Sequence, residues 1–352
     1  MLTKVLIALL FITFPLGQVV RWEFLGGQVV LRPNDLVACM LGFMGLLKLQ
    51  GSTLQRPLIL WYLAMILSLA LNIFNYTPTQ LLISSSYIIR FILYSGLYFI
   101  FKDFKLNKNY LVIVCLLIAV FGFGQYWFIP DTRFLKDFGW DDHYYRLIST
   151  FLDPGFTGTI LLLGLLLTKN KIIKIILYLA MALTYSRATF LMFIVSYAVV
   201  AWYQKSIKIF LTACLIMALT LIFLPRTFGE GTKLSRETSF WGRINNWKMT
   251  VLEWRKAPVF GLGFGGYRYA TNAPQSSHAG AGADSSLLLV LATTGIVGLF
   301  AYLNLLRAIW INNKNYLFRA SFIGIIIASF FNNTLFYPFV MEWLWILFAL
   351  PF

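Results

Sequence analysis

Arginine is the residue type whose positions in this chain best suit chemistry. Arg187 follows a serine at the junction of two apolar segments, and Arg243 lies within a long polar segment. A guanidinium group carries a fixed positive charge and several N–H donors, so it suits phosphate oxygens. We therefore predict that both arginines are catalytic residues that bind phosphate. The alternative for Arg187 is a topology anchor that snorkels to lipid headgroups. Arg243 falls in an amphipathic helix expected over residues 240–256, and the alternative for Arg243 is that this helix lies on the bilayer with its arginines on lipid headgroups.

Asp284 is the carboxylate best placed to act as a catalytic general base. It directly precedes an apolar segment, and a carboxylate within reach of a hydroxyl group can take its proton. An aspartate at this place is also a good N-cap for the helix that follows, and this role is the alternative. The other candidates for the base are the two histidines of the chain, His278 and His143, although a histidine in a loop is often only solvated.

The polar segment 226–284 interrupts an otherwise apolar sequence. It holds eight lysines and arginines, with tryptophans and tyrosines between them and four glycines near its centre. Flat aromatic faces suit sugar rings, and glycine lets backbone N–H groups approach a phosphate closely. The alternative for the glycines is a flexible turn. Together with charged residues elsewhere, the segment provides the residues that we predict to bind substrate: Arg146, Trp247, Gly263, Gly265, Tyr267, His278 and Arg90.

Two groups of acidic residues need a separate explanation. The run Asp141, Asp142 and His143 could hold a divalent cation beside a diphosphate, but it lies in a polar loop and offers too few hard oxygen ligands, so we predict no metal and no cofactor. Asp153 falls inside an expected membrane span that Arg146 enters. A carboxylate at such a place implies a partner, and we expect an arginine in that role.

Composition places these residues in a membrane protein. Apolar residues make up 59% of the chain and charged residues 12%, with a mean hydropathy of +0.76. Apolar stretches long enough to cross a hydrocarbon core of roughly 30 Å recur along the chain. We predict an all-α polytopic protein in which residues 1–352 form a single membrane domain. About twelve transmembrane helices are expected near residues 3–20, 35–48, 57–74, 80–101, 110–129, 148–168, 171–185, 188–204, 206–225, 285–310, 317–334 and 337–351.

The loops between these segments differ in charge. Short loops rich in lysine and arginine share one face with Lys4, and Asp103 is their single acid. The positive-inside rule makes that face cytoplasmic. The large loop 226–284 and a smaller loop 130–147 are then periplasmic in a bacterial inner membrane. The net charge of +16 follows largely from the short basic loops, so we do not expect nucleic acid as a partner. A periplasmic reaction also needs a substrate that is already activated, such as a lipid-linked diphosphate.

The order of several short motifs resembles the O-antigen polymerase and ligase superfamily. The motifs occur together with the twelve-helix layout and with a large loop between the ninth and tenth helices. In chain order they are Arg146 with Asp153-Pro154-Gly155, Ser186-Arg187, Gly242-Arg243 with Trp247, the glycines 261, 263 and 265 after Pro258, Asp284-Ser285, and the stretch 295–299.

This resemblance implies a membrane-embedded, GT-C-like glycosyltransferase that inverts the anomeric centre without a metal. It implies periplasmic donor and acceptor glycans linked to undecaprenyl diphosphate, with Arg187 and Arg243 on the donor diphosphate. The ligase branch carries a histidine before the tenth span, where this chain has Asp284, so the polymerase branch is favoured. A separate chain-length regulator is a plausible partner. The alternatives are a ligase that transfers the glycan to lipid A core, a transporter of the lipid-linked sugar, and a scaffold without activity.

Overall fold

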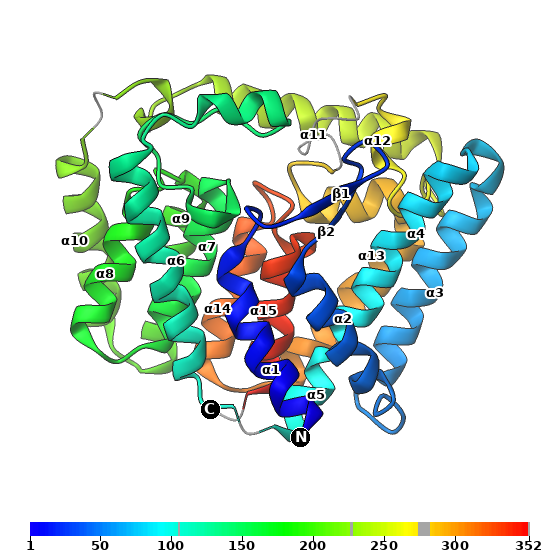
Figure 1. Cartoon of the computed structure of the whole chain (residues 1–352), viewed down its shortest axis with the longest axis horizontal. Helices are drawn as coiled ribbons and strands as arrows, with labels where there is room; N and C mark the ends of the chain where they lie inside the picture. Colours follow the sequence, from blue (N-terminus) through cyan, green and yellow to red (C-terminus); the bar gives the residue numbers. More distant parts are fainter. Residues whose placement is uncertain (105, 226–227, 274–281, 351–352) are drawn as a thin grey trace.

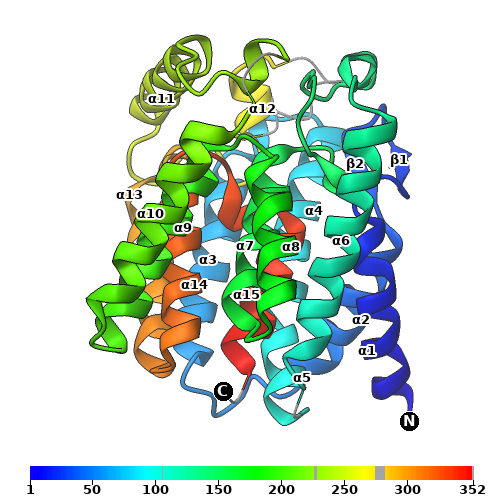
Figure 2. The ribbon, with the colours of Figure 1, turned by 90° about the vertical axis from the view of Figure 1, so that its left-hand side faces the viewer.

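The computed structural model describes residues 1–104, 106–225, 228–273 and 282–350, and this part of the chain is almost entirely helical. Helices stand side by side in a bundle, and one further helix lies across an end of it (Figures 1 and 2). The α-helices are α1 (Leu2–Thr13), α2 (Pro33–Leu46), α3 (Gln55–Leu71), α4 (Pro78–Ser95), α5 (Leu97–Asp103), α6 (Asn109–Phe128), α7 (Pro154–Leu167), α8 (Lys171–Ala182), α9 (Arg187–Tyr203), α10 (Ile207–Phe223), α11 (Thr238–Lys256), α12 (Tyr267–Ala270), α13 (Ser286–Asn312), α14 (Tyr316–Ala328) and α15 (Pro338–Ala349).

Each of the twelve apolar segments expected from the sequence contains a helix of the bundle, with α4 and α5 together filling the fourth. Three helical stretches in the described ranges are long and apolar enough to cross a membrane, namely Pro78–Asp103, Asn109–Phe128 and Ser286–Asn312, and the remaining apolar helices are shorter. The chain is therefore a membrane protein, while a total of twelve crossings stays a prediction.

Local sequence signals explain where several helices begin. Thr77 and Gln80 form a reciprocal capping box at α4, and Asn170 accepts hydrogen bonds from two backbone N–H groups at the start of α8. The sixth segment differs from its expected limits, because α7 begins at Pro154 and not near residue 148. Asp153 caps this helix and accepts a hydrogen bond from Phe156 N at 2.8 Å. Since proline fits the first turn of a helix, the pair sets the start of α7.

A short β-hairpin departs from the all-α prediction. Strand β1 (Trp22–Phe24) pairs antiparallel with β2 (Val29–Leu31), and Trp22 lies opposite Leu31. Strands of three residues leave almost no periodic signal in a sequence. The hairpin crosses the bundle just before α2 begins (Figure 1), so it adds backbone to the end of the molecule where α11 lies.

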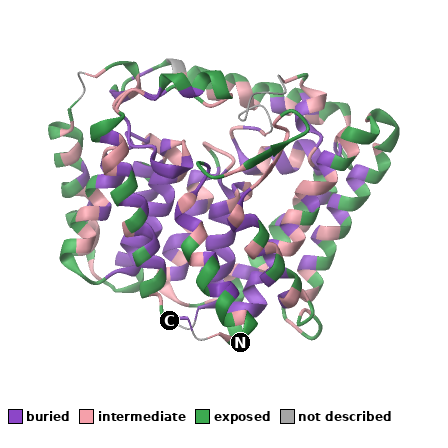
Figure 3. Cartoon of the chain, viewed as in Figure 1, coloured by how far each residue is buried: buried purple, intermediate pink, exposed green. Residues whose placement is uncertain are grey.

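The core is centred on α15. Every residue of this helix from Phe339 to Ala349 is buried, including Glu342, and other helices surround it (Figures 2 and 3). By contrast, α10 buries only Ala213 and Met217 and exposes many large apolar side chains. A water-soluble monomer rarely exposes such an apolar surface, whereas lipid tails cover it without cost.

The two ends of the bundle differ as the charge pattern predicts. The N-terminus and the end of α15 lie at one end, and α11 and α12 lie at the other (Figures 1 and 2). Lys48 and Asp103, which the sequence places on the same face, form an ion pair of 2.5 Å. The helix expected over residues 240–256 of the polar segment is confirmed: α11 occupies Thr238–Lys256, and it packs against α13.

Candidate functional site

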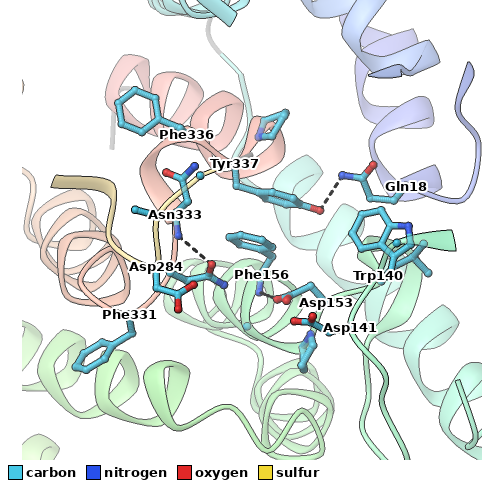
Figure 4. Close-up of a pocket in the computed structure, with 18 of the residues that line it drawn as sticks. Gln18, Trp140, Asp141, Asp153, Phe156, Asp284, Phe331, Asn333, Phe336 and Tyr337 are labelled. Carbon is cyan, nitrogen blue, oxygen red and sulfur yellow. Dashed lines mark hydrogen bonds between the residues drawn. The ribbon is translucent and has the colours of Figure 1, made fainter. Parts of the chain in front are cut away.

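A cavity of about 480 Å³ lies at the end of the bundle that α11 covers (Figure 4). Its wall is drawn from many separate parts of the chain: the β-hairpin, α4, the stretch 139–156, the start of α9, α11, α12, and the loops before α13 and α15. The volume falls within the range of about 300–1,000 Å³ that ligand pockets occupy.

Arginine dominates the charge of this cavity. Three carboxylates, Asp141, Asp153 and Asp284, line it as well. The arginines that line it are Arg32, Arg90, Arg146, Arg187, Arg236, Arg243 and Arg268. Positive charge therefore exceeds negative charge on the wall, and such a wall favours an anionic ligand.

Four of these residues, Arg146, Arg187, Arg236 and Arg243, form what we call the first arginine group. Arg146 Nε donates to the Thr184 carbonyl at 3.0 Å, and Arg187 Nη1 donates to the carbonyls of Leu234 and Arg236 at 3.2 and 3.0 Å.

Arg236 Nη1 donates to the Gly231 carbonyl at 2.7 Å, and Arg236 Nε donates to Ser239 Oγ at 3.1 Å. Within the described ranges, no member of the first arginine group forms an ion pair with a carboxylate. Backbone carbonyls thus orient three of these guanidinium groups but leave their charge uncompensated.

Burial and mutual repulsion act on the same arginines. Burial is the larger cause and the charge of Arg236 the smaller one that together lower the pKa of Arg146 to about 9. Burial, together with the charges of Arg187 and Arg243, lowers the pKa of Arg236 to about 10. Both groups still carry a proton at neutral pH. A bound anion would relieve the repulsion, which is the electrostatic condition of a phosphate site.

The three other arginines, Arg32, Arg90 and Arg268, form a second arginine group on the wall made by the hairpin, α4 and α12. Asp35 is shared between Arg32 at 3.0 Å and Arg90 at 3.8 Å. The sequence prediction included Arg90 but missed Arg32, although an arginine three residues before an aspartate at a helix start is a visible signal.

Asp284 is not the N-cap of α13, which answers the alternative left open by the sequence. Ser285 is the cap, and its side chain accepts a hydrogen bond from Leu288 N at 3.5 Å. Asp284 is held through its backbone, since its N–H donates to Asn246 Oδ1 at 2.8 Å and its carbonyl accepts a hydrogen bond from Trp247 Nε1 at 3.5 Å. Its carboxyl group faces the cavity beside Asn333 (Figure 4).

Burial raises the pKa of Asp284, Arg243 opposes the rise, and Asp141 adds to it. A raised pKa gives a carboxylate more of the basicity that proton abstraction needs. The expectation that an arginine pairs with Asp153 is corrected here: Asp153 caps α7, and it forms no ion pair with any residue that the structure describes.

Aromatic side chains form part of the cavity wall between these carboxylates. Phe156 and Tyr337 stack with ring centroids 3.7 Å apart and an interplanar angle of 3°. In the close-up, Asp284 lies on one side of this pair, and Asp141 and Asp153 lie on the other (Figure 4). The sequence prediction missed both rings, because an aromatic residue in an apolar chain gives no sign of facing a cavity.

Of the two histidines, His143 lines the cavity. It is buried, and desolvation, followed by the charges of Arg146 and Arg236, holds its pKa well below the usual range. Its Nε2 atom has no hydrogen-bond partner within the described chain. The imidazole is therefore neutral and presents a free ring nitrogen, whereas His278 lies outside the described residues.

Four residues predicted to bind substrate do not line the cavity: Trp247, Gly263, Gly265 and Tyr267. Trp247 supports the Asp284 backbone from behind, and the Tyr267 hydroxyl group lies 2.7 Å from Thr250 Oγ1.

The glycines pack against a kink in α13. Gly263 N donates to the Thr293 carbonyl at 3.0 Å, and Gly295 breaks the helix with a φ of 66°. A Cβ at Gly261 would meet the Thr293 backbone at 2.3 Å, so this glycine run allows a close contact of two backbones.

Among the residues that the structure describes, no three histidine, cysteine or acidic side chains are grouped to hold a metal ion. Asp141 and His143 both line the cavity, but Asp142 does not. The cationic side chains that line the cavity are Arg32, Arg90, Arg146, Arg187, Arg236, Arg243 and Arg268.

The fold and the cavity define a helical membrane protein with an arginine-rich site at one end of its bundle. Residues 172–303 match the family model described as O-antigen ligase, a stretch that runs from α8 into α13 and includes Arg187, Arg236, Arg243 and Asp284. The resemblance to the O-antigen polymerase and ligase superfamily is thereby confirmed over this stretch, and that superfamily is associated with glycosyl transfer. A comparison with curated proteins found no match.

Proposed function

We propose that this protein is a glycosyltransferase that polymerises oligosaccharide repeat units carried on undecaprenyl diphosphate. The observation that carries the proposal is the first arginine group: four guanidinium groups around one cavity, without a carboxylate partner among the described residues. Such a group suits a diphosphate that gains negative charge as it leaves.

In the proposed reaction, the Asp284 carboxylate takes the proton from a hydroxyl group of the acceptor sugar. The freed oxygen forms a bond to the anomeric carbon of the donor glycan, on the face opposite the diphosphate. The bond from that carbon to the diphosphate oxygen breaks, and its electron pair leaves with the phosphate. The anomeric configuration is inverted, and the product remains attached to the acceptor lipid.

The members of the first arginine group take different parts in this reaction. Arg243 makes no hydrogen bond or ion pair within the described ranges, so its donors are free for a ligand. Arg187 and Arg236 are fixed by backbone carbonyls, which keeps their positive charge in place before the substrate arrives. Charge that is already oriented stabilises a transition state without the cost of reorganisation.

The membrane orientation belongs to the same proposal. The cavity is lined by residues of α11, α12 and β2. These elements lie at the end of the bundle opposite the N-terminus (Figure 2), and the basic loops near that terminus favour the cytoplasmic side. The active site would then face the periplasm from the inner membrane, with residues 226–284 and 130–147 on the periplasmic side.

A ligase is the second candidate, because the matching family model carries that description. Asp284 in place of the histidine expected of the ligase branch favours polymerisation. A strain that lacks the protein separates the two candidates: loss of a polymerase leaves lipid A core with a single repeat unit, whereas loss of a ligase leaves bare core and lipid-linked polymer.

A further inference from the structure

Two neighbouring asparagines in the cavity wall, Asn332 and Asn333, have no part in the reaction proposed above. They lie in the connection between α14 and α15, and the Asn333 side chain lies beside Asp284 in the close-up (Figure 4). A side-chain amide carries two N–H donors and one oxygen acceptor, so its orientation decides what it offers to a ligand.

The oxygen atom of each amide is already bound by the protein. Asn332 Oδ1 accepts a hydrogen bond from Asn333 N at 2.9 Å, and Asn333 Oδ1 accepts one from Ser286 Oγ at 3.3 Å. The same Ser286 Oγ accepts a hydrogen bond from Leu335 N at 3.1 Å, which ties this connection to the start of α13. The two NH2 groups form no hydrogen bond within the described ranges, so the protein holds the amides with their donors unused.

A glycine lies in front of each of these NH2 groups. A Cβ at Gly155 would lie 3.3 Å from Asn332 Nδ2, and a Cβ at Gly282 would lie 2.8 Å from Asn333 Nδ2. Both glycines line the cavity. Because neither has a side chain, the space next to the two NH2 groups stays open to a ligand.

Carboxylate oxygens lie close to the same NH2 groups. The Cβ position at Gly155 is also 3.1 Å from Asp153 Oδ1, and the Asp284 carboxyl group lies beside Asn333 (Figure 4). An NH2 group only donates hydrogen bonds and a carboxylate only accepts them, whereas a sugar hydroxyl group does both. Donors next to acceptors therefore match neighbouring hydroxyl groups of one sugar ring, while the carboxylates would repel a phosphate.

An aromatic ring completes this part of the wall. Phe156 is partly exposed and lines the cavity. Asp284 lies on one side of the stacked Phe156 and Tyr337 rings, and Asp153 lies on the other (Figure 4). An aromatic face suits the C–H groups of a sugar ring whose hydroxyl groups are bound at its edge.

We propose that Asn332 and Asn333, together with Asp153 and Asp284, form a subsite that binds hydroxyl groups of the acceptor sugar. The subsite selects which hydroxyl group reaches the Asp284 carboxylate. This inference rests on the proposed function, in which Asp284 takes the proton of that hydroxyl group. The two asparagines are then specificity-determining residues that contact the sugar and do not bind the diphosphate.

The test measures the binding of two soluble probes to the full chain purified in detergent. The first probe is the lipid-free oligosaccharide of the repeat unit, and the second is inorganic diphosphate. Asn332→Ala/Asn333→Ala should weaken binding of the oligosaccharide about tenfold, because hydrogen bonds to the sugar are lost, and should leave diphosphate binding unchanged. Asn245→Ala is the matched control, since this exposed asparagine of α11 does not line the cavity, and it should bind both probes like the wild type.

A second variant, Asn332→Asp/Asn333→Asp, separates sugar binding from a structural role. Aspartate keeps the side-chain oxygen atoms that Asn333 N and Ser286 Oγ contact, but it replaces each NH2 group by an oxygen that cannot donate. The proposal predicts that this variant loses as much oligosaccharide binding as the alanine variant. A structural role of the two amides predicts binding like the wild type.

The proposal is overturned if the wild type does not bind the oligosaccharide at millimolar concentration, or if either folded double variant binds it like the wild type. It is also overturned if the alanine variant loses diphosphate binding instead. The proposed function fails separately: Arg187→Ala/Arg243→Ala that binds diphosphate like the wild type would remove the role of the arginines and leave the sugar subsite in place.

Discussion

Replacing Arg243 by alanine separates a catalytic from a structural role for the first arginine group. Arg243 lines the cavity but makes no hydrogen bond or ion pair within the described chain, so its removal leaves no buried group without a partner. It also removes a charge that repels Arg146, Arg187 and Arg236. The free energy of unfolding should change by no more than about 0.5 kcal/mol.

The effect on catalysis should be much larger. Loss of one oriented donor at a site of developing negative charge raises the barrier by about 2.7–4 kcal/mol, which is a loss of about 10²–10³ in kcat. The assay measures glycan elongation on lipid-linked repeat units with purified protein, alongside thermal unfolding in the same detergent.

Arg255→Ala is the matched control for this experiment. Arg255 lies on the same helix, is exposed and does not line the cavity. Its replacement should leave elongation unchanged. The reasoning is refuted if Arg243→Ala keeps the wild-type kcat. It is also refuted if both variants lose activity equally, because an equal loss would result from a disturbed helix and not from the loss of a cavity residue.

Three further predictions test the carboxylates and the packing of the site. Burial and Asp141 raise the pKa of Asp284, so kcat/KM should fall as the pH drops through that pKa. Asp141→Asn removes one of the two causes and should shift the acidic side of the pH profile to lower pH. A pH profile that does not move would exclude Asp284 as the base. Gly261→Ala places a Cβ 2.3 Å from backbone and should abolish the folded protein on size-exclusion chromatography, whereas Gly124→Ala, with no atom within 4 Å, should behave as wild type. Asp35→Asn breaks a buried ion pair and should cost about 3–5 kcal/mol in unfolding free energy, and a thermal midpoint equal to wild type would contradict this.

Much of the fold could be predicted from the sequence, because apolar segments alternate with polar loops and lysine and arginine cluster in the loops of one face. The helix limits were less predictable where local caps decide them. Asp153 and Pro154 start α7 about six residues later than hydropathy indicates, and the hairpin at residues 22–31 is too short to leave a pattern.

The site was only partly predictable for a different physical reason. Arg146, Arg187 and Asp284 were predicted because a charge beside an apolar segment is conspicuous, and Arg243 was predicted from the Gly242-Arg243 motif of the resemblance. All four line the cavity. Arg236 was missed because it lies among other basic residues of the polar segment, and sequence order does not say which of them faces inward.

The rings on the cavity wall come from segments far apart in the chain. Phe156 and Tyr337 meet only because α7 and α15 pack together in the bundle. Their contact depends on tertiary structure and leaves no local signal. The same holds for Gly261, because the backbone of α13 makes the close contact that requires a glycine there.

The most direct test of the account is a glycolipid gel of a deletion strain complemented with wild type, Arg187→Ala, Arg243→Ala, Asp284→Ala or the control Arg255→Ala. The account predicts that the deletion strain makes core with a single repeat unit. It also predicts that the three cavity variants match this pattern, while the wild type and the control restore the full ladder. Full ladders from the cavity variants would contradict the catalytic role of these residues, and bare core in the deletion strain would contradict polymerisation.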